Sequence, residues 1–149
     1  MTDIIKTLKS ETSVWDCLKN EGKPAVLYGM GDGADKVLAA FERYGIKVSG
    51  VMASDDFVRG QSFHGFTVKK LGSLEEELGD FTIALCFASQ LPDVMSLIKS
   101  VAKRHKTLVP SVPVFGNTLF DDEFISRYSE DISKAFDLLA DEQSRRVYE

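Results

Sequence analysis

Along the first third of the chain, apolar residues occur first in a continuous run, then at helical spacing, and then in a second run. The run Ala25–Tyr28 is continuous and ends at a group of glycines, whereas residues 35–44 place apolar side chains at helical spacing. A second apolar run occupies residues 46–52. Short continuous runs are typical of buried strands, and three- to four-residue spacing is typical of helices. The pattern predicts a strand, a glycine turn, a helix and a second strand, which together form a βαβ unit.

The same spacing predicts further elements downstream. Residues 81–87 are almost all apolar, as in a central parallel strand, and residues 107–109 form a shorter run. Between these runs, residues 91–103 have the pattern of an amphipathic helix that opens near Pro92. These elements predict an α/β fold: a Rossmann-like three-layer domain with a mainly parallel sheet of about four to five strands and helical N- and C-terminal extensions.

The segment between the second and third predicted strands is polar and irregular. Residues 66–68 could add a small extended piece, and Ser73 is predicted to cap a short acidic helix that ends at Leu78.

The helical extensions set the predicted domain organisation. We expect one domain over residues 1–149, with a helical lead-in at 1–20, an α/β core at 24–118 and a helical tail at 119–149. The tail carries one apolar face, which needs a covering surface. A homodimer through this tail is one interpretation. The residues of that face are Ile125, Tyr128, Ile132, Phe136 and Leu139.

Composition and charge narrow the class of protein. The 149 residues are 44% hydrophobic and carry a net charge of -5, which fits a globular domain and argues against non-specific nucleic-acid binding. The chain has no secretory signal pattern and no apolar run long enough to cross a membrane, so we expect a cytoplasmic protein without a membrane partner. Cys17 and Cys86 lie far apart in the sequence and are predicted to be buried, inert thiols.

The glycines between the first strand and helix are the main candidate for a binding site. Gly29, Met30, Gly31, Asp32 and Gly33 precede Ala34 in a G-x-G-x-x-A pattern. The first glycine permits a tight reversal, and the second lets a ligand phosphate approach the backbone near a helix N-terminus. In a strand–turn–helix–strand context this pattern predicts nucleotide-type binding, with a purely structural turn as the alternative.

Two residues argue against particular ligands at this turn. A carboxylate at Asp32 would repel a pyrophosphate unless it turns away or caps the helix. Leu27 stands where class I methyltransferases usually have an acidic residue, which argues against S-adenosylmethionine binding at the turn.

Other candidate ligand contacts follow the second and third strands. Asp55 and Asp56 could accept bonds from ribose hydroxyls or cap the loop, and Ser89 could bind a phosphate or sugar or cap a helix. His64 is a candidate acid or base, and His105 lies among cations. Since no nucleophile, base and orienting acid form a recognisable set, catalytic residues remain unassigned, and no metal-binding pattern is present.

The runs at residues 25–36, 45–61 and 139–144 resemble the N-terminal region of bacterial FkbM-type methyltransferases. The resemblance implies a Rossmann-like segment ahead of a class I methyltransferase domain, which transfers a methyl group from S-adenosylmethionine, often to a sugar hydroxyl. This chain ends at Glu149, about where that domain would begin. The resemblance therefore implies a C-terminal methyltransferase domain as partner, with S-adenosylmethionine bound only there.

The first half is also similar to the small nucleotide-sugar-binding domain of acetyltransferases that modify UDP-amino-sugars. This likeness implies ligand contacts at Gly29, Gly31, Gly33 and Asp55. We therefore expect an accessory nucleotide- or nucleotide-sugar-binding domain of an FkbM-type methyltransferase. The alternatives are a free-standing NAD- or S-adenosylmethionine-dependent enzyme that uses His64, and a non-catalytic dimerisation scaffold.

Overall fold

The structure is a computed structural model that describes residues 3–148. It divides into two compact units. One is an α/β unit, Val14–Val112, and the other is a helical unit that combines the N-terminal residues up to Ser13 with the C-terminal residues from Pro113. Each unit has its own buried apolar cluster.

The α/β unit is built on a six-stranded sheet with the order β3-β4-β2-β1-β5-β6. Its strand pairs are parallel, except that β3 runs antiparallel to β4. The predicted α/β, Rossmann-like class is therefore confirmed. The strands are β1 (Ala25–Tyr28), β2 (Val48–Met52), β3 (Ser62–Phe63), β4 (Phe66–Lys69), β5 (Thr82–Leu85) and β6 (Thr107–Leu108).

The sheet has more strands than expected because a hairpin forms in the polar segment after β2. His64 and Gly65 make its turn, both with positive φ, and join β3 to β4. Tight hairpin turns require positive φ, which glycine adopts freely and histidine adopts more often than most residues.

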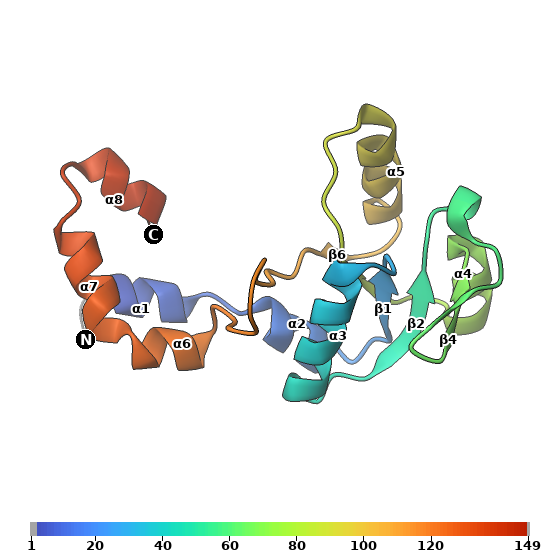
Figure 1. The fold of residues 1–149 in the computed structure, drawn as a ribbon, viewed down its shortest axis with the longest axis horizontal. Helices are drawn as coiled ribbons and strands as arrows, with labels where there is room; N and C mark the ends of the chain where they lie inside the picture. The colour runs from blue at the N-terminus through green and yellow to red at the C-terminus, as the bar shows by residue number, and fades with distance from the viewer. Residues whose placement is uncertain (1–2, 149) are drawn as a thin grey trace. The chain divides into compact units, whose positions relative to one another are not determined.

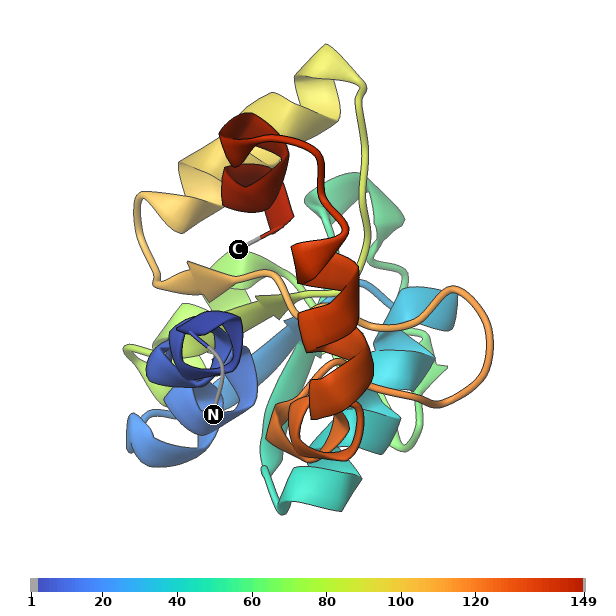
Figure 2. The same cartoon turned by 90° about the vertical axis from the view of Figure 1, so that its left-hand side faces the viewer.

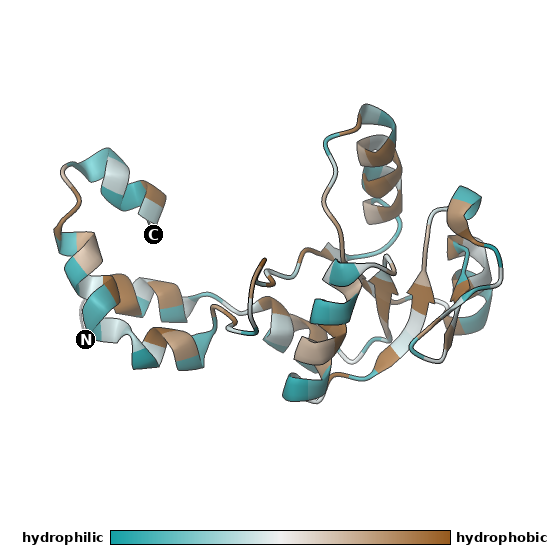
Figure 3. Ribbon diagram, in the orientation of Figure 1, coloured by the Kyte–Doolittle hydropathy of each residue, from teal (hydrophilic) through white to brown (hydrophobic). Residues whose placement is uncertain are grey.

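Burial explains which strands occupy the centre. Every residue of β1 and β5 is buried, so both faces of these strands are covered, and β1 is mostly brown in Figure 3. Tyr28 at the end of β1 pairs with Met52 on one side and with Leu85 on the other. The carboxyl ends of β2, β1 and β5 therefore meet at one edge of the sheet.

Helices cover both faces of this sheet. α3 and α5 lie on opposite sides of it (Figures 1 and 2), and Leu74 of α4 and Val101 of α5 join Val26 and Ile83 in one buried cluster. The helices of the unit are α2 (Val14–Asn20), α3 (Asp32–Tyr44), α4 (Leu71–Leu78), α5 (Pro92–Ala102) and the 3₁₀ turn η1 (Asp55–Phe57).

Two helix starts differ from the sequence predictions. α3 begins at Asp32, one turn earlier than expected, because the glycine turn ends at Gly31, which is the N-cap. The prediction that Ser73 caps the acidic helix is wrong. α4 begins at Leu71 with Lys70 at the N-cap, so Ser73 lies inside its first turn.

An aromatic stack joins α2 to α3. The ring of Trp15 stacks on Tyr44 with centroids 5.4 Å apart and meets Phe41 edge-on at 6.4 Å. Trp15 and Phe41 are buried. The second half of the predicted lead-in therefore belongs to the α/β unit.

The helical unit encloses a separate apolar cluster. Ile4 and Ile5 of α1 are buried with Ile125 and Ile132 from the tail, so α1 covers part of the apolar face of the tail within the same chain, while Tyr128 of that face stays 40% exposed. The side chain of Asp121 caps α6 by accepting a bond from the Phe124 N–H at 2.9 Å. The helices are α1 (Asp3–Ser10), α6 (Asp122–Arg127), α7 (Ser129–Asp137) and α8 (Glu142–Tyr148).

No helix among residues 3–148 combines the length and the apolarity that a bilayer crossing requires.

Candidate functional site

The first glycine of the turn is fixed by a close approach. Gly29 has φ of +120°, and its N–H donates to the Met52 carbonyl at 2.9 Å, which ties the end of β1 to the end of β2. A Cβ at this position would lie 3.0 Å from the Phe87 ring. Both the backbone angle and the neighbouring ring therefore favour glycine.

The other two glycines serve different purposes. A Cβ on Gly33 would lie 2.0 Å from the Cys86 carbonyl oxygen, so this glycine lets α3 pass against the backbone after β5. Gly31 is exposed, and a Cβ there would meet nothing within 4 Å. Ala34, which the motif assigned to close helix–strand packing, is fully buried, but the tightest approach falls on Gly33.

A cavity of about 350 Å³ opens beside this turn. It lies between residues 28–30 at the end of β1, Ser54 and Phe57 after β2, residues 87–89 after β5, and the first half of α5. β1 is flanked by β2, which follows it along the chain, and by β5, which the chain reaches only after β4. The strand order therefore reverses at β1, which makes this the topological switch point of the sheet. Open α/β sheets bind their ligands at this position.

The cavity is apolar and uncharged. None of the described residues that line it carries a charge, and its aromatic side chains are Tyr28, Phe57 and Phe87. Two hydroxyls, Tyr28 Oη and Ser54 Oγ, form a hydrogen bond of 2.7 Å at its wall. Ser89 Oγ, also in the lining, accepts the Leu91 N–H at 3.2 Å ahead of α5.

The candidate residues from the sequence are divided by the structure. Gly29, Met30 and Ser89 line the cavity, whereas Gly31, Asp32 and Gly33 lie just beyond it at the start of α3. Asp55 and Asp56 are exposed in η1, and neither lines the cavity.

Asp32 is not the helix cap. Gly31 holds that position without a side-chain cap bond, and the Asp32 carboxylate is 83% exposed. It forms an ion pair with Lys36 one turn along α3, Nζ to Oδ2 3.0 Å. This carboxylate therefore faces solvent.

A loop after β2 is bonded to the glycine turn. Gln61 Nε2 donates to the Phe57 carbonyl at 2.6 Å and reaches Met30 Sδ at 3.4 Å. At the hairpin tip, His64 Nε2 lies 2.6 Å from Asp35 Oδ1 on α3. His64 does not line the cavity, so in this structure it braces the hairpin against α3.

Sequence reasoning missed most of the cavity wall. Ser54, Phe57, Phe87, Val94 and Leu97 come from three segments that are separated along the chain. The structure supplies a signal that the sequence lacks. Leu97 is 48% exposed and Phe57 is 62% exposed, and large exposed apolar side chains that approach one site are typical of a binding surface.

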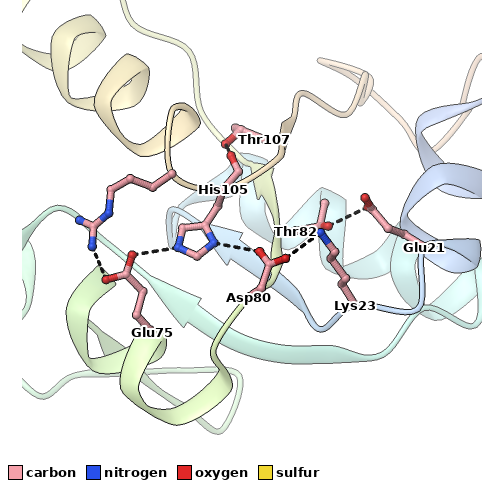
Figure 4. Close-up of polar contacts among 8 residues, drawn as sticks. Glu21, Lys23, Glu75, Asp80, Thr82, His105 and Thr107 are labelled. Atoms are coloured by element: carbon pink, nitrogen blue, oxygen red, sulfur yellow. Dashed lines mark hydrogen bonds and ion pairs between the residues drawn. The ribbon is translucent and has the colours of Figure 1, made fainter.

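A cluster of polar and charged side chains lies at the amino-terminal ends of the strands, at the edge of the sheet opposite the cavity (Figure 4). The Lys23 ammonium lies 2.7 Å from Asp80 and holds the pKa of that carboxyl below its usual value. A hydrogen bond from Thr82 at 2.7 Å, supported by Lys106 at 3.1 Å, lowers the pKa of Glu21. These pairs connect the segments that enter β1, β5 and β6.

His105, like Thr82, is a buried member of this cluster. Its ring stacks on Phe81 with centroids 4.0 Å apart. Nε2 lies 2.9 Å from Glu75 Oε1, and Nδ1 lies 3.5 Å from Asp80 Oδ1, while Arg104 binds the other oxygen of Glu75. These contacts connect α4 to the start of β6. They lie at the end of the strands opposite the cavity.

The two cysteines differ in burial. Cys86 is buried, which raises the pKa of its thiol to about 12, whereas Cys17 is only partly buried. Among residues 3–148 no group of His, Cys, Asp or Glu side chains is arranged to hold a metal ion.

The sheet order, the glycine turn and the cavity define the class as a Rossmann-like α/β domain. No protein-family model and no curated protein matches the chain. Two solved structures of RSP, a Rex-family repressor, are similar to it at 15% identity and a TM-score of 0.41. The match to the structure in complex with β-NADH covers 79% of this chain and 64% of the RSP chain. The match to the other structure covers 78% of this chain and 63% of the RSP chain.

This chain thus spans less than two thirds of either RSP chain.

Proposed function

We propose that this chain is a binding module that holds the nucleoside part of a nucleotide-type ligand in the cavity beside the glycine turn. The observation that carries the proposal is the place of this uncharged, partly aromatic cavity at the switch point of the sheet. Ligand sites of open α/β sheets lie there, and apolar walls with a few polar groups are typical of them.

The lining suits a base and a sugar. Phe57 and Phe87 supply apolar ring surface for a flat base. The hydroxyls of Tyr28 and Ser54 share one hydrogen bond, which leaves one hydroxyl proton of the pair to donate to a ligand. Ser54 comes two residues after β2, close to the position where dinucleotide sites bind ribose hydroxyls.

We further propose that the module serves a methyltransferase of the FkbM type, with a nucleotide or nucleotide-sugar as its ligand. The support is the resemblance of residues 25–36, 45–61 and 139–144 to the N-terminal region of such proteins. In this arrangement the methyl donor binds to a catalytic domain outside this chain. Leu27, at the position where methyl-donor sites carry an acid, is fully buried, which agrees with that division.

Calorimetric titration of the purified chain tests the ligand. Adenosine, uridine, UDP-sugars, NAD and S-adenosylmethionine are each added up to millimolar concentration, and at least one nucleoside-containing compound is expected to bind. Ala88→Phe, at an exposed position of the cavity wall, should weaken that binding by about tenfold or more, because the ring occupies the ligand volume.

Ala39→Phe is the matched control, since it adds the same ring to an exposed position of α3 away from the lining. It should leave the affinity unchanged. The proposal is refuted if none of the compounds shows binding in the titrations. It is also refuted if Ala88→Phe and Ala39→Phe change the affinity equally.

A further inference from the structure

Two carboxylates stand where a ligand phosphate would meet the glycine turn. Asp32 and Asp35 lie in the first turn of α3, which starts directly after Gly31, and their side chains are 83% and 53% exposed. The N-terminus of a helix attracts negative charge, and here the chain supplies that charge itself. A bound phosphate would add a like charge at the same helix end.

Two basic side chains already bind these carboxylates. Lys36 Nζ lies 3.0 Å from Asp32 Oδ2, and His64 Nε2 lies 2.6 Å from Asp35 Oδ1. A phosphate that recruited either group would have to replace its carboxylate partner. Neither Lys36 nor His64 can therefore bind a phosphate at the turn without losing its present ion pair or hydrogen bond.

The cavity itself is matched to an uncharged group. Its described lining has hydroxyl groups and apolar side chains but no charged side chain. Its volume of about 350 Å³ lies near the lower end of the range of about 300–1,000 Å³ found for ligand sites. A nucleoside suits this size better than a complete dinucleotide.

We infer that the site selects a nucleoside group without a phosphate against the glycine turn, so that each added phosphate weakens binding. This inference rests on the proposed function and specifies its ligand. The physical cause is repulsion between the phosphate and the carboxylates of Asp32 and Asp35 at the start of α3.

Two matched series of probes test the inference by calorimetry: adenosine, AMP and ADP, and uridine, UMP and UDP. In the series that binds, affinity should fall from nucleoside to diphosphate, by about fivefold or more at low salt. Added salt should narrow the gap, because screening weakens repulsion between exposed charges.

Charge substitution locates the cause. Asp32→Asn should raise the affinity for the diphosphate by about threefold and leave that for the nucleoside unchanged. Glu42→Gln removes the same charge from an exposed position in the last turn of α3, and it should leave both affinities unchanged.

The outcomes separate the inference from the proposed function. A diphosphate that binds more tightly than its nucleoside would overturn the inference and leave the proposed binding function standing. Equal changes of the diphosphate-to-nucleoside affinity ratio in Asp32→Asn and Glu42→Gln would likewise overturn the inference and leave the binding function standing. If no compound of either series binds, the proposed function fails and the inference fails with it.

Discussion

The backbone of Gly33 lies so close to that of Cys86 that a Cβ on the glycine would come within 2.0 Å of the Cys86 carbonyl oxygen. A backbone atom cannot move aside as a flexible side chain can. Gly33→Ala should therefore lower the free energy of unfolding by about 1–3 kcal/mol, measured by chemical denaturation.

Gly31→Ala is the control for this substitution. Gly31 has φ of −107°, which any residue adopts, and no atom lies within 4 Å of its Cβ position. Because Gly31 is the N-cap of α3, where alanine is less favourable than glycine, the loss should be about 0.5–1 kcal/mol and smaller than that of Gly33→Ala. Equal losses at the two glycines would show that conformational freedom, and not the close approach, matters here.

Glu75 binds His105 with one carboxylate oxygen and Arg104 with the other. Glu75→Gln keeps the shape of the side chain but removes its charge, which weakens both bonds. We expect a loss of about 1 kcal/mol in unfolding free energy, because the site is partly screened by solvent. Glu76→Gln, at the exposed neighbouring position, should cost much less, and a comparable cost would contradict the role of this cluster.

The amino-terminal cluster also predicts a dependence of stability on pH. The Glu21 carboxyl has its pKa lowered from 4.5, chiefly by the hydrogen bond from Thr82, and that of Asp80 is lowered from 3.8, chiefly by Lys23. Groups with depressed pKa values in the folded state stabilise the fold above the unfolded-state values, and this contribution disappears as pH falls below them.

Thermal unfolding between pH 7 and pH 3 measures this effect. The melting temperature of the double variant Glu21→Gln/Asp80→Asn should fall less steeply below about pH 4.5 than that of the natural chain. If the melting temperature of the double variant fell with pH as steeply as that of the natural chain, these two carboxyls would not contribute to the loss of stability in acid.

Phe57 exposes most of its ring beside the cavity, so its removal should affect binding more than folding. Phe57→Ala should weaken nucleoside binding by about fivefold to tenfold through loss of ring contact, while the melting temperature changes little. Phe115→Ala, at a ring 90% exposed and outside the cavity lining, is the control. A normal affinity in Phe57→Ala would remove this ring from the proposed site.

Burial and a pKa of about 12 should make Cys86 unreactive in the folded chain. Iodoacetamide at pH 8 is expected to modify Cys17 first, and Cys86 only after denaturant is added. Peptide mass spectrometry distinguishes the two sites. Rapid modification of Cys86 under native conditions would show that the end of β5 opens readily.

The central strands could be predicted from sequence because their burial on both faces leaves a local signature. Residues 25–28 form a continuous apolar run, residues 81–87 are apolar except for Thr82, and the glycines after Tyr28 mark the turn. β3 escaped prediction because Ser62 and Phe63 form a strand only through pairing with β4. A two-residue strand in a polar segment has no periodicity of its own.

The cavity and the His105 cluster were harder to predict because both depend on tertiary contact. Ser54, Phe87 and Leu97 meet only after the strand order has formed. Likewise, Glu75 and His105 are 30 residues apart, and their sequence neighbours do not indicate that they pair. Motif reading found Gly29, Met30 and Ser89 because these residues mark strand ends, where local spacing is informative.

Trp15 is the single tryptophan of the chain, and its stack with Tyr44 and Phe41 lies entirely within the α/β unit. Its fluorescence is therefore an optical reporter of that unit alone, whereas far-ultraviolet circular dichroism sums the helices of both units. Denaturation followed by both signals can resolve two transitions, and any difference between their midpoints measures how independently the helical unit melts.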